Sequence, residues 1–145
     1  MRGLLSCLLV GCAADHDGYE PVDCNLVTTD DTFVVGLEKP GKSGLLTFKL
    51  MSVAPAPPAR GNNTWIVDIT RTVDTTPFDG AAIRVTPYMV SHPHGTAIVA
   101  HSTPISAAQY ELSPVNFSME GVWETTIRAT IGDETDSAAY TFCIP

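Results

Sequence analysis

The sequence has no apolar run long enough to cross a bilayer. Its longest such stretch, residues 4–10, is far shorter than the roughly 20 apolar residues that a transmembrane helix requires. Basic residues are also scarce, because 8 Lys and Arg stand against 16 Asp and Glu and give a formal net charge of -8. Nucleic acids are bound through basic patches, which so few scattered cations do not form. We therefore expect no nucleic-acid partner.

The patterns of common catalytic sites are missing as well. The chain contains no Gly-x-Ser-x-Gly, no His-Glu-x-x-His and no glycine-rich phosphate loop. Ser91 precedes His92, but adjacency in sequence gives no hydrogen-bond geometry for a nucleophile and its base, so a hydrolase is the least favoured class. We predict that the protein is not an enzyme.

The N-terminus carries the most informative pattern. Arg2 precedes the apolar run, which ends in Leu9-Val10-Gly11-Cys12. This order resembles a bacterial lipoprotein signal, in which small residues precede the cysteine that receives the lipid. The resemblance implies that residues 1–11 are a cleaved signal peptide and that Cys12 is lipidated and anchors the protein to the cell envelope, outside the cytoplasm. The alternatives are an ordinary signal peptide with an incidental cysteine and a misassigned start codon.

Two features refine the expected location. Stable membrane attachment needs more than one acyl chain, and lipoproteins of this kind carry several, so the resemblance implies permanent tethering. Ala13 and Ala14 follow the cysteine, in place of the aspartate that often retains such proteins at the inner membrane. In a cell with two membranes, this favours the outer membrane.

The cysteine count agrees with an oxidising compartment. Of the four cysteines, Cys7 would leave with the signal peptide and Cys12 would carry the lipid. This leaves Cys24 and Cys143, and two remaining cysteines outside the cytoplasm usually pair. Such a disulfide would close nearly the whole domain as one loop. Two unrelated thiols are the alternative.

Composition divides the rest of the chain into a tether and one domain. Residues 12–31 are polar and acidic, and we interpret them as the lipidated N-terminus and an acidic tether. Residues 32–145 have the size of one small domain and enough apolar residues for one core.

The domain is predicted to be all-β, because period-two patterns bounded by turn-forming residues recur through it and helical periodicity is hard to find. In residues 123–131, Trp123, Ile127 and Ala129 alternate with polar residues, so one face packs on a core and the other meets water. A turn-rich segment then leads to a last strand and a C-terminal hairpin. Earlier strands are expected at residues 33–37, 45–53, 64–70, 81–88, 96–101 and 110–117. Seven or eight short strands without helices favour an antiparallel β-sandwich.

The order of several motifs resembles the YtkA-like and FixH-like domains. The matching segments are Pro58-Ala59-Arg60-Gly61-Asn62-Asn63 before a Trp/Ile/Val strand, the strand at residues 79–89, His92-Pro93-His94-Gly95, Tyr110-Glu111-Leu112, and the corner at residues 115–123. The resemblance implies an immunoglobulin-like fold and an extracytoplasmic location. Copper handling and respiratory-oxidase assembly are among the roles suggested for relatives.

One constellation of residues carries metal chemistry. In an extended segment His92 and His94 lie on the same side, and Pro93 stiffens the backbone between them. Thioethers prefer Cu(I) and imidazoles suit Cu(II), Zn and Ni, so a mixed set indicates copper. The candidate ligands are Met89, His92, His94, His101 and Met119.

Alternatives exist for these residues. His-Pro-His-Gly also suits an exposed turn, and the methionines also suit the core. Asp133, Glu134 and Asp136 are compatible with calcium, although turn chemistry explains them equally. The expected function is therefore a lipid-anchored, copper-binding domain. The alternative is a structural or protein-interaction module of the envelope that recognises a partner protein by strand addition.

Overall fold

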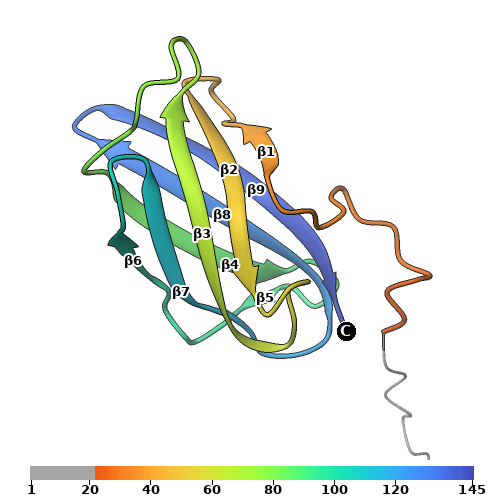
Figure 1. Cartoon of the computed structure of the whole chain (residues 1–145). Helices are drawn as coiled ribbons and strands as arrows, with labels where there is room; N and C mark the ends of the chain where they lie inside the picture. The colour runs from red at the N-terminus through yellow and green to blue at the C-terminus, as the bar shows by residue number, and fades with distance from the viewer. Residues whose placement is uncertain (1–21) are drawn as a thin grey trace, which may run out of the picture.

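The computed structural model describes residues 22–145 and consists of strands joined by loops (Figure 1). No helix in this part of the chain could span a membrane. The predicted signal peptide, Cys12 and the first part of the tether lie outside the described residues. The strands are β1 (Leu37–Pro40), β2 (Leu46–Ala54), β3 (Gly61–Arg71), β4 (Ala82–Met89), β5 (His94–Gly95), β6 (His101–Pro104), β7 (Gln109–Phe117), β8 (Gly121–Ile131) and β9 (Glu134–Ile144).

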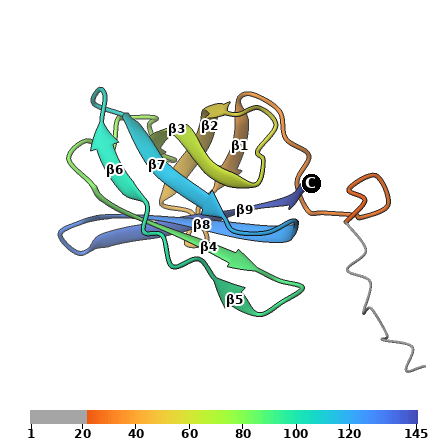
Figure 2. The same ribbon diagram turned by 90° about the horizontal axis from the view of Figure 1, so that it is seen from below.

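The strands form two antiparallel sheets that pack face to face (Figure 2). One sheet has the order β1-β2-β3-β7-β6 and the other has the order β5-β4-β8-β9. From β2 onwards this is the immunoglobulin arrangement, in which strands A-B-E-D face strands C′-C-F-G. Strand β1 adds one further edge strand beside β2. The predicted fold class, an immunoglobulin-like β-sandwich, is confirmed.

Two predicted strands differ from the observed ones. The strand expected at residues 33–37 begins only at Leu37, because Val34 to Leu37 form a turn in which the Leu37 N–H donates to the Val34 carbonyl at 3.1 Å. Residues 96–100, expected to be a strand, instead cross from one sheet to the other between β5 and β6. In each case a turn or a crossing segment stands where a strand was expected, and a short strand follows it.

Alternating side chains of both sheets form the core. Trp123, Ile127 and Ala129 of β8 are fully buried, as their alternation predicts. Trp65 of β3 faces them across the sandwich and contacts Tyr140 and Phe142 of β9, with ring centroids 6.2 and 6.0 Å apart. The fully buried Trp65 and Trp123 therefore join the two sheets through aromatic contacts.

A disulfide between Cys24 and Cys143 attaches the segment before β1 to the last strand, with Cα atoms 5.6 Å apart. The predicted pairing is confirmed. Because such bonds persist in oxidising compartments, it indicates an extracytoplasmic location. Residues 24–31, which composition assigns to the tether, are thus held against the domain.

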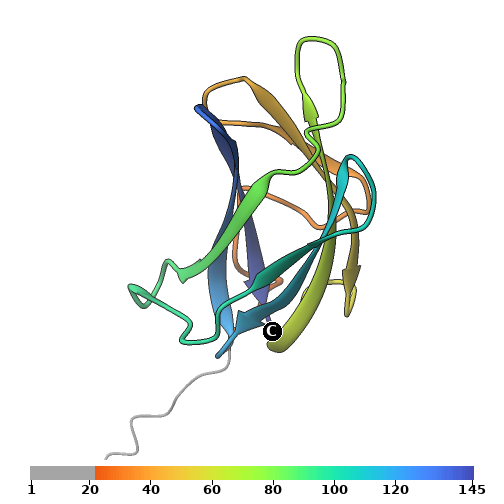
Figure 3. The same ribbon diagram turned by 90° about the vertical axis from the view of Figure 1, so that its left-hand side faces the viewer.

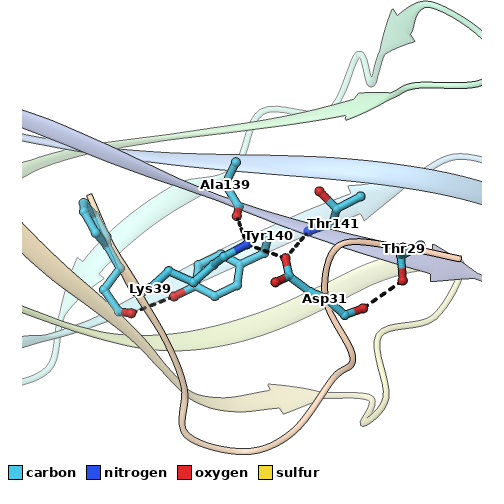
Figure 4. A network of polar contacts seen from close by, with 7 residues as sticks. Thr29, Asp31, Lys39, Ala139, Tyr140 and Thr141 are labelled. Atoms are coloured by element: carbon cyan, nitrogen blue, oxygen red, sulfur yellow. Dashed lines mark hydrogen bonds and ion pairs between the residues drawn. The ribbon is translucent and has the colours of Figure 1, made fainter. Parts of the chain in front are cut away.

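A second attachment follows at Asp31, whose buried carboxylate accepts the Thr141 N–H at 2.8 Å and pairs with Lys39 Nζ at 2.7 Å (Figure 4). Lys39 also donates to the Ala139 carbonyl and lies over the Tyr140 ring. Burial raises the pKa of Tyr140, which stays protonated and donates to the Phe48 carbonyl at 2.9 Å. These contacts, which we name the Asp31 network, cover the outer edge of β9.

Candidate functional site

The candidate metal ligands gather only in part, at one end of the four-stranded sheet. In the register of this sheet His94 of β5 lies opposite Met89 of β4, and Met89 lies opposite Trp123 of β8. Residues directly opposite each other in antiparallel strands point to the same face. Met89 and Trp123 are buried in the core, and His94, although exposed, lies on the same face of the sheet. The turn that joins β4 to β5 projects from the body of the domain (Figure 3).

The imidazole of His94 is oriented by two contacts. Its Nδ1 lies 2.8 Å from the carbonyl oxygen of Gly95, and its ring meets the Trp123 indole edge-on at a centroid distance of 5.8 Å. A carbonyl oxygen only accepts hydrogen bonds, so this contact assigns a proton to Nδ1, and in the neutral ring the lone pair is then on Nε2. Histidines that bind metals are held in this way by their other ring nitrogen.

Met89 is buried beside the corner that begins β8. Its methyl carbon lies only 2.2 Å from the position that a Cβ on Gly121 would occupy, and Ser91 Oγ lies 3.5 Å from the same position. Gly121 also has a φ of +138°, which other residues rarely adopt. Glycine at this corner therefore makes room for the Met89 thioether.

We expect Gly121→Ala to lower the free energy of unfolding by about 2 kcal/mol, because the new methyl group displaces the Met89 side chain and strains the backbone. The matched control is Gly132→Ala, at a φ of +54° with no atom within 4 Å of the new Cβ. This control carries backbone strain alone, so chemical denaturation should show a smaller loss for it. Equal losses would contradict the close packing of Met89.

Met119 belongs to the same end of the domain. Its carbonyl oxygen accepts the Trp123 indole N–H at 3.0 Å, and its side chain is half-buried against the core. Trp123 thus contacts His94 through its ring and Met119 through its nitrogen. Both methionines and one histidine of the predicted set are associated with this indole.

The other two predicted residues lie elsewhere. His92 is exposed in the turn between β4 and β5, where the backbone is not extended, so the expected same-side arrangement with His94 does not form. His101 is exposed on β6 in the other sheet, opposite Ser113 of β7.

The segment that follows His94 is fixed by an amide network. Thr96 Oγ1 donates to Asn116 Oδ1 at 2.8 Å, and Asn116 Nδ2 donates to Asn62 Oδ1 at 2.7 Å. The Ile98 N–H in turn donates to Thr96 Oγ1 at 3.2 Å. These bonds attach the chain beyond β5 to strands β3 and β7 and limit the movement of His94.

Sequence reasoning left three contributors out of the site. Trp123 was assigned to the core, although its indole contacts His94 and Met119. Gly121 and Asn116 were noted only as parts of motifs. A Gly-x-Trp pattern at a strand start, two residues after a methionine, is the signal that could have found them.

The acidic C-terminal hairpin has a structural explanation. Asp136 accepts backbone N–H groups from Ser43, Leu45 and Leu46 at 2.8 to 3.0 Å, so both carboxylate oxygens are occupied. Among residues 22–145, no three His, Cys, Asp or Glu side chains converge in a way that could hold a metal ion. The calcium alternative therefore gains no support from Asp136.

An immunoglobulin-like sandwich closed by a disulfide defines the chain as an extracytoplasmic domain of the all-β class. A comparison with protein families matches residues 42–128 to the YtkA-like family, and the chain belongs to this family. The match covers the strands that carry Met89, His94 and Trp123.

A search of curated proteins finds no match. Among solved structures, the chain is similar to a copper-bound variant of FetP from uropathogenic Escherichia coli, with a TM-score of 0.49 and 8% sequence identity over 76% of this chain and 95% of that chain. A similarity at this level carries no information about ligands.

Proposed function

We propose that the protein is a lipid-anchored extracytoplasmic domain that binds Cu(I), with Met89 and His94 as ligands and Met119 as a third. The observation that carries the proposal is the register of β4 and β5, which pairs a thioether with an imidazole. His92 and His101 of the predicted set are left out, because one lies in the projecting turn and the other in the opposite sheet.

The chemistry of this donor set favours Cu(I). Thioether sulfur is a soft ligand that selects Cu(I), whereas imidazole nitrogen binds several metals. The free Nε2 of His94 supports coordination, because the Gly95 carbonyl holds the other ring nitrogen. Carboxylates, which hard cations such as calcium prefer, are not among the three ligands.

The surroundings of the pair add to this preference. Met89 is only 1% exposed, so its sulfur lies in surroundings with little water. The His94 imidazole beside it is accessible to solvent. The Trp123 indole, which is fully buried and contacts both His94 and Met119, adds apolar surface to this end of the site. A monovalent soft cation is therefore better matched to this site than a strongly hydrated divalent one.

The proposal keeps the anchoring that the sequence indicates. Lipidation of Cys12, cleavage of residues 1–11 and sorting to the outer membrane all remain proposals, supported by the signal pattern and by the disulfide-permissive compartment. Mass spectrometry of the protein extracted from membranes tests the lipid. A mature N-terminus other than an acylated Cys12 would reject it.

The copper site is tested by competition titration of Cu(I) against a chromogenic chelator. Residues 22–145 serve as the sample, because they exclude Cys7, Cys12 and His16 as stray ligands. We expect His94→Ala to weaken Cu(I) binding at least about 100-fold and Met89→Leu at least about tenfold, the scale of losing a ligand or its support. Met89→Leu keeps the volume of the core and removes only the sulfur.

His92→Ala and His101→Ala are the matched controls. Each removes one exposed imidazole from the same domain, and neither should change Cu(I) affinity. Loss of affinity in a control but not in His94→Ala would reject the proposed ligand pair. Equal binding by all four variants would reject the site as a whole.

A further inference from the structure

Strand β4 has an open edge over most of its length. It pairs with β8 along its whole length, but β5 covers only Tyr88 and Met89 on the other side. Residues 82–87 therefore have a neighbouring strand on one side and none, within the described part of the chain, on the other.

The direction of the backbone groups along this edge follows from two contacts. The Val90 N–H donates to the Val122 carbonyl of β8 at 3.0 Å, so every second residue back along β4 also faces β8. Pro87 has no N–H, and its carbonyl oxygen lies on the side of Gly95. The N–H and C=O groups of Ile83 and Val85 thus point away from β8, toward the open edge.

The opposite edge of the same sheet is treated differently. On β9, the Lys42 N–H donates to the Ser137 carbonyl, and the Asp31 network engages Ala139 and Thr141. Covering an edge in this way prevents association with other chains. The sheet is therefore closed at β9 and open at β4.

A groove lies along the open edge. It has a volume of about 360 Å³ and lies between β4 and the chain formed by Gly95 of β5 and the crossing segment, residues 96–100. Ile98 and Val99 of this segment are 43% and 69% exposed, which gives the groove an apolar wall. Unpaired backbone groups beside an apolar wall are the features to which an extended peptide binds.

The outer face of the sheet beside this edge is cationic in an otherwise acidic protein. Arg84 of β4 lies directly opposite Arg128 of β8, and both are exposed. Like charges in this position destabilise a sheet unless an anion lies between them. Lys39, Lys49 and Arg71 have carboxylate partners within 4.0 Å, whereas no ion pair forms at Arg84 or Arg128 in the described structure. Glu124, on the same face as Arg128, is four residues away, about 13 Å along the strand.

We propose that an extended acidic segment of a partner protein adds to the open edge of β4, with its backbone bonded to Ile83 and Val85 and its carboxylates facing Arg84 and Arg128. An acidic segment matches this edge better than a second copy of this chain, because antiparallel pairing of two β4 edges brings the Arg84 side chains of both copies together. The site does not depend on the copper proposal.

The test uses the ¹⁵N-labelled protein and two synthetic probes, acetyl-Val-Glu-Val-Glu-Val-Glu-amide and the same peptide with Lys in place of Glu. We expect the Glu peptide to slow amide hydrogen exchange at Ile83 and Val85 at least tenfold, and to bind at least tenfold more tightly than the Lys peptide. Arg84→Glu should reverse this preference. Ile83→Pro should abolish binding without unfolding the domain, because the lost N–H faces away from β8, as the missing N–H of Pro87 does.

Three results would overturn the proposal. These are no protection by either peptide, equal binding of the two peptides, and protection at β6 or β9 in place of β4. Thermal melting of Ile83→Pro serves as the folding control, and Arg84→Glu reports the charge preference independently of that variant.

Discussion

Reducing the Cys24–Cys143 disulfide is expected to lower the free energy of unfolding by about 4 to 5 kcal/mol, because the bond closes a very long loop. The two cysteines are 119 residues apart, so the bond restricts almost the whole unfolded domain. Unfolding in guanidinium chloride with and without a thiol reductant measures the difference.

A double variant, Cys24→Ser with Cys143→Ser, separates the bond from the reductant. Its free energy of unfolding should match that of the reduced protein, and its mobility on a non-reducing gel should differ from that of the wild type. The folded state should persist in both, since the Asp31 network still holds the chain before β1 against β9. A stability unchanged by reduction would contradict the chain-entropy account.

Replacing Asp136 by alanine should lower the free energy of unfolding by about 3 to 5 kcal/mol, because several backbone N–H groups lose a charged acceptor at once. Its carboxylate accepts N–H groups from Ser43, Leu45, Leu46 and Ser137, and the Leu46 bond is buried. Equilibrium urea unfolding at neutral pH measures the loss. Asp133→Ala, in the same hairpin and exposed, is the control and should be nearly neutral.

The Asp136 carboxylate also makes the free energy of unfolding depend on pH in the acid range. Burial favours the neutral form, but backbone N–H donors from Ser43, Leu46 and Ser137 outweigh it and hold the pKa of Asp136 below its ordinary value of 3.8. A pKa lowered in the folded state stabilises the protein above the unfolded value, and this contribution is lost as the pH falls through the folded value. We expect Asp136→Asn to flatten the stability profile below pH 3.8. An unchanged acid limb would contradict this assignment.

The fold was predictable where one residue pattern had one structural solution. The alternation through Trp123, Ile127 and Ala129 fixes which face of β8 is buried. The Cys24–Cys143 pairing was predictable once the signal pattern had assigned the other two cysteines. Residues 96–100 misled the prediction, because apolar residues there resemble a strand. In the folded chain, Thr96 bonds the Asn116 side chain from a distant strand, which no local pattern reveals.

The candidate site was predictable only as a list of residue types. Pairing of His94 with Met89 depends on the register of a two-residue strand, which the turn at residues 90–93 determines. The prediction assumed extended backbone at His92, whereas the chain turns at that residue. The Trp123 indole, which organises the site, was hidden among core residues of the same pattern.

The position of the disulfide also limits the distance between the candidate site and a membrane to which Cys12 is anchored. Cys143 lies opposite Val122, one residue from the row that contains Trp123 and Met89. The disulfide therefore attaches the predicted tether to the domain at the same end as His94. The 12 peptide units from Cys12 to Cys24 span at most about 40 Å when fully stretched. With a lipid on Cys12, any exchange of copper at this end would take place in a thin layer above the bilayer, within reach of membrane-embedded partners.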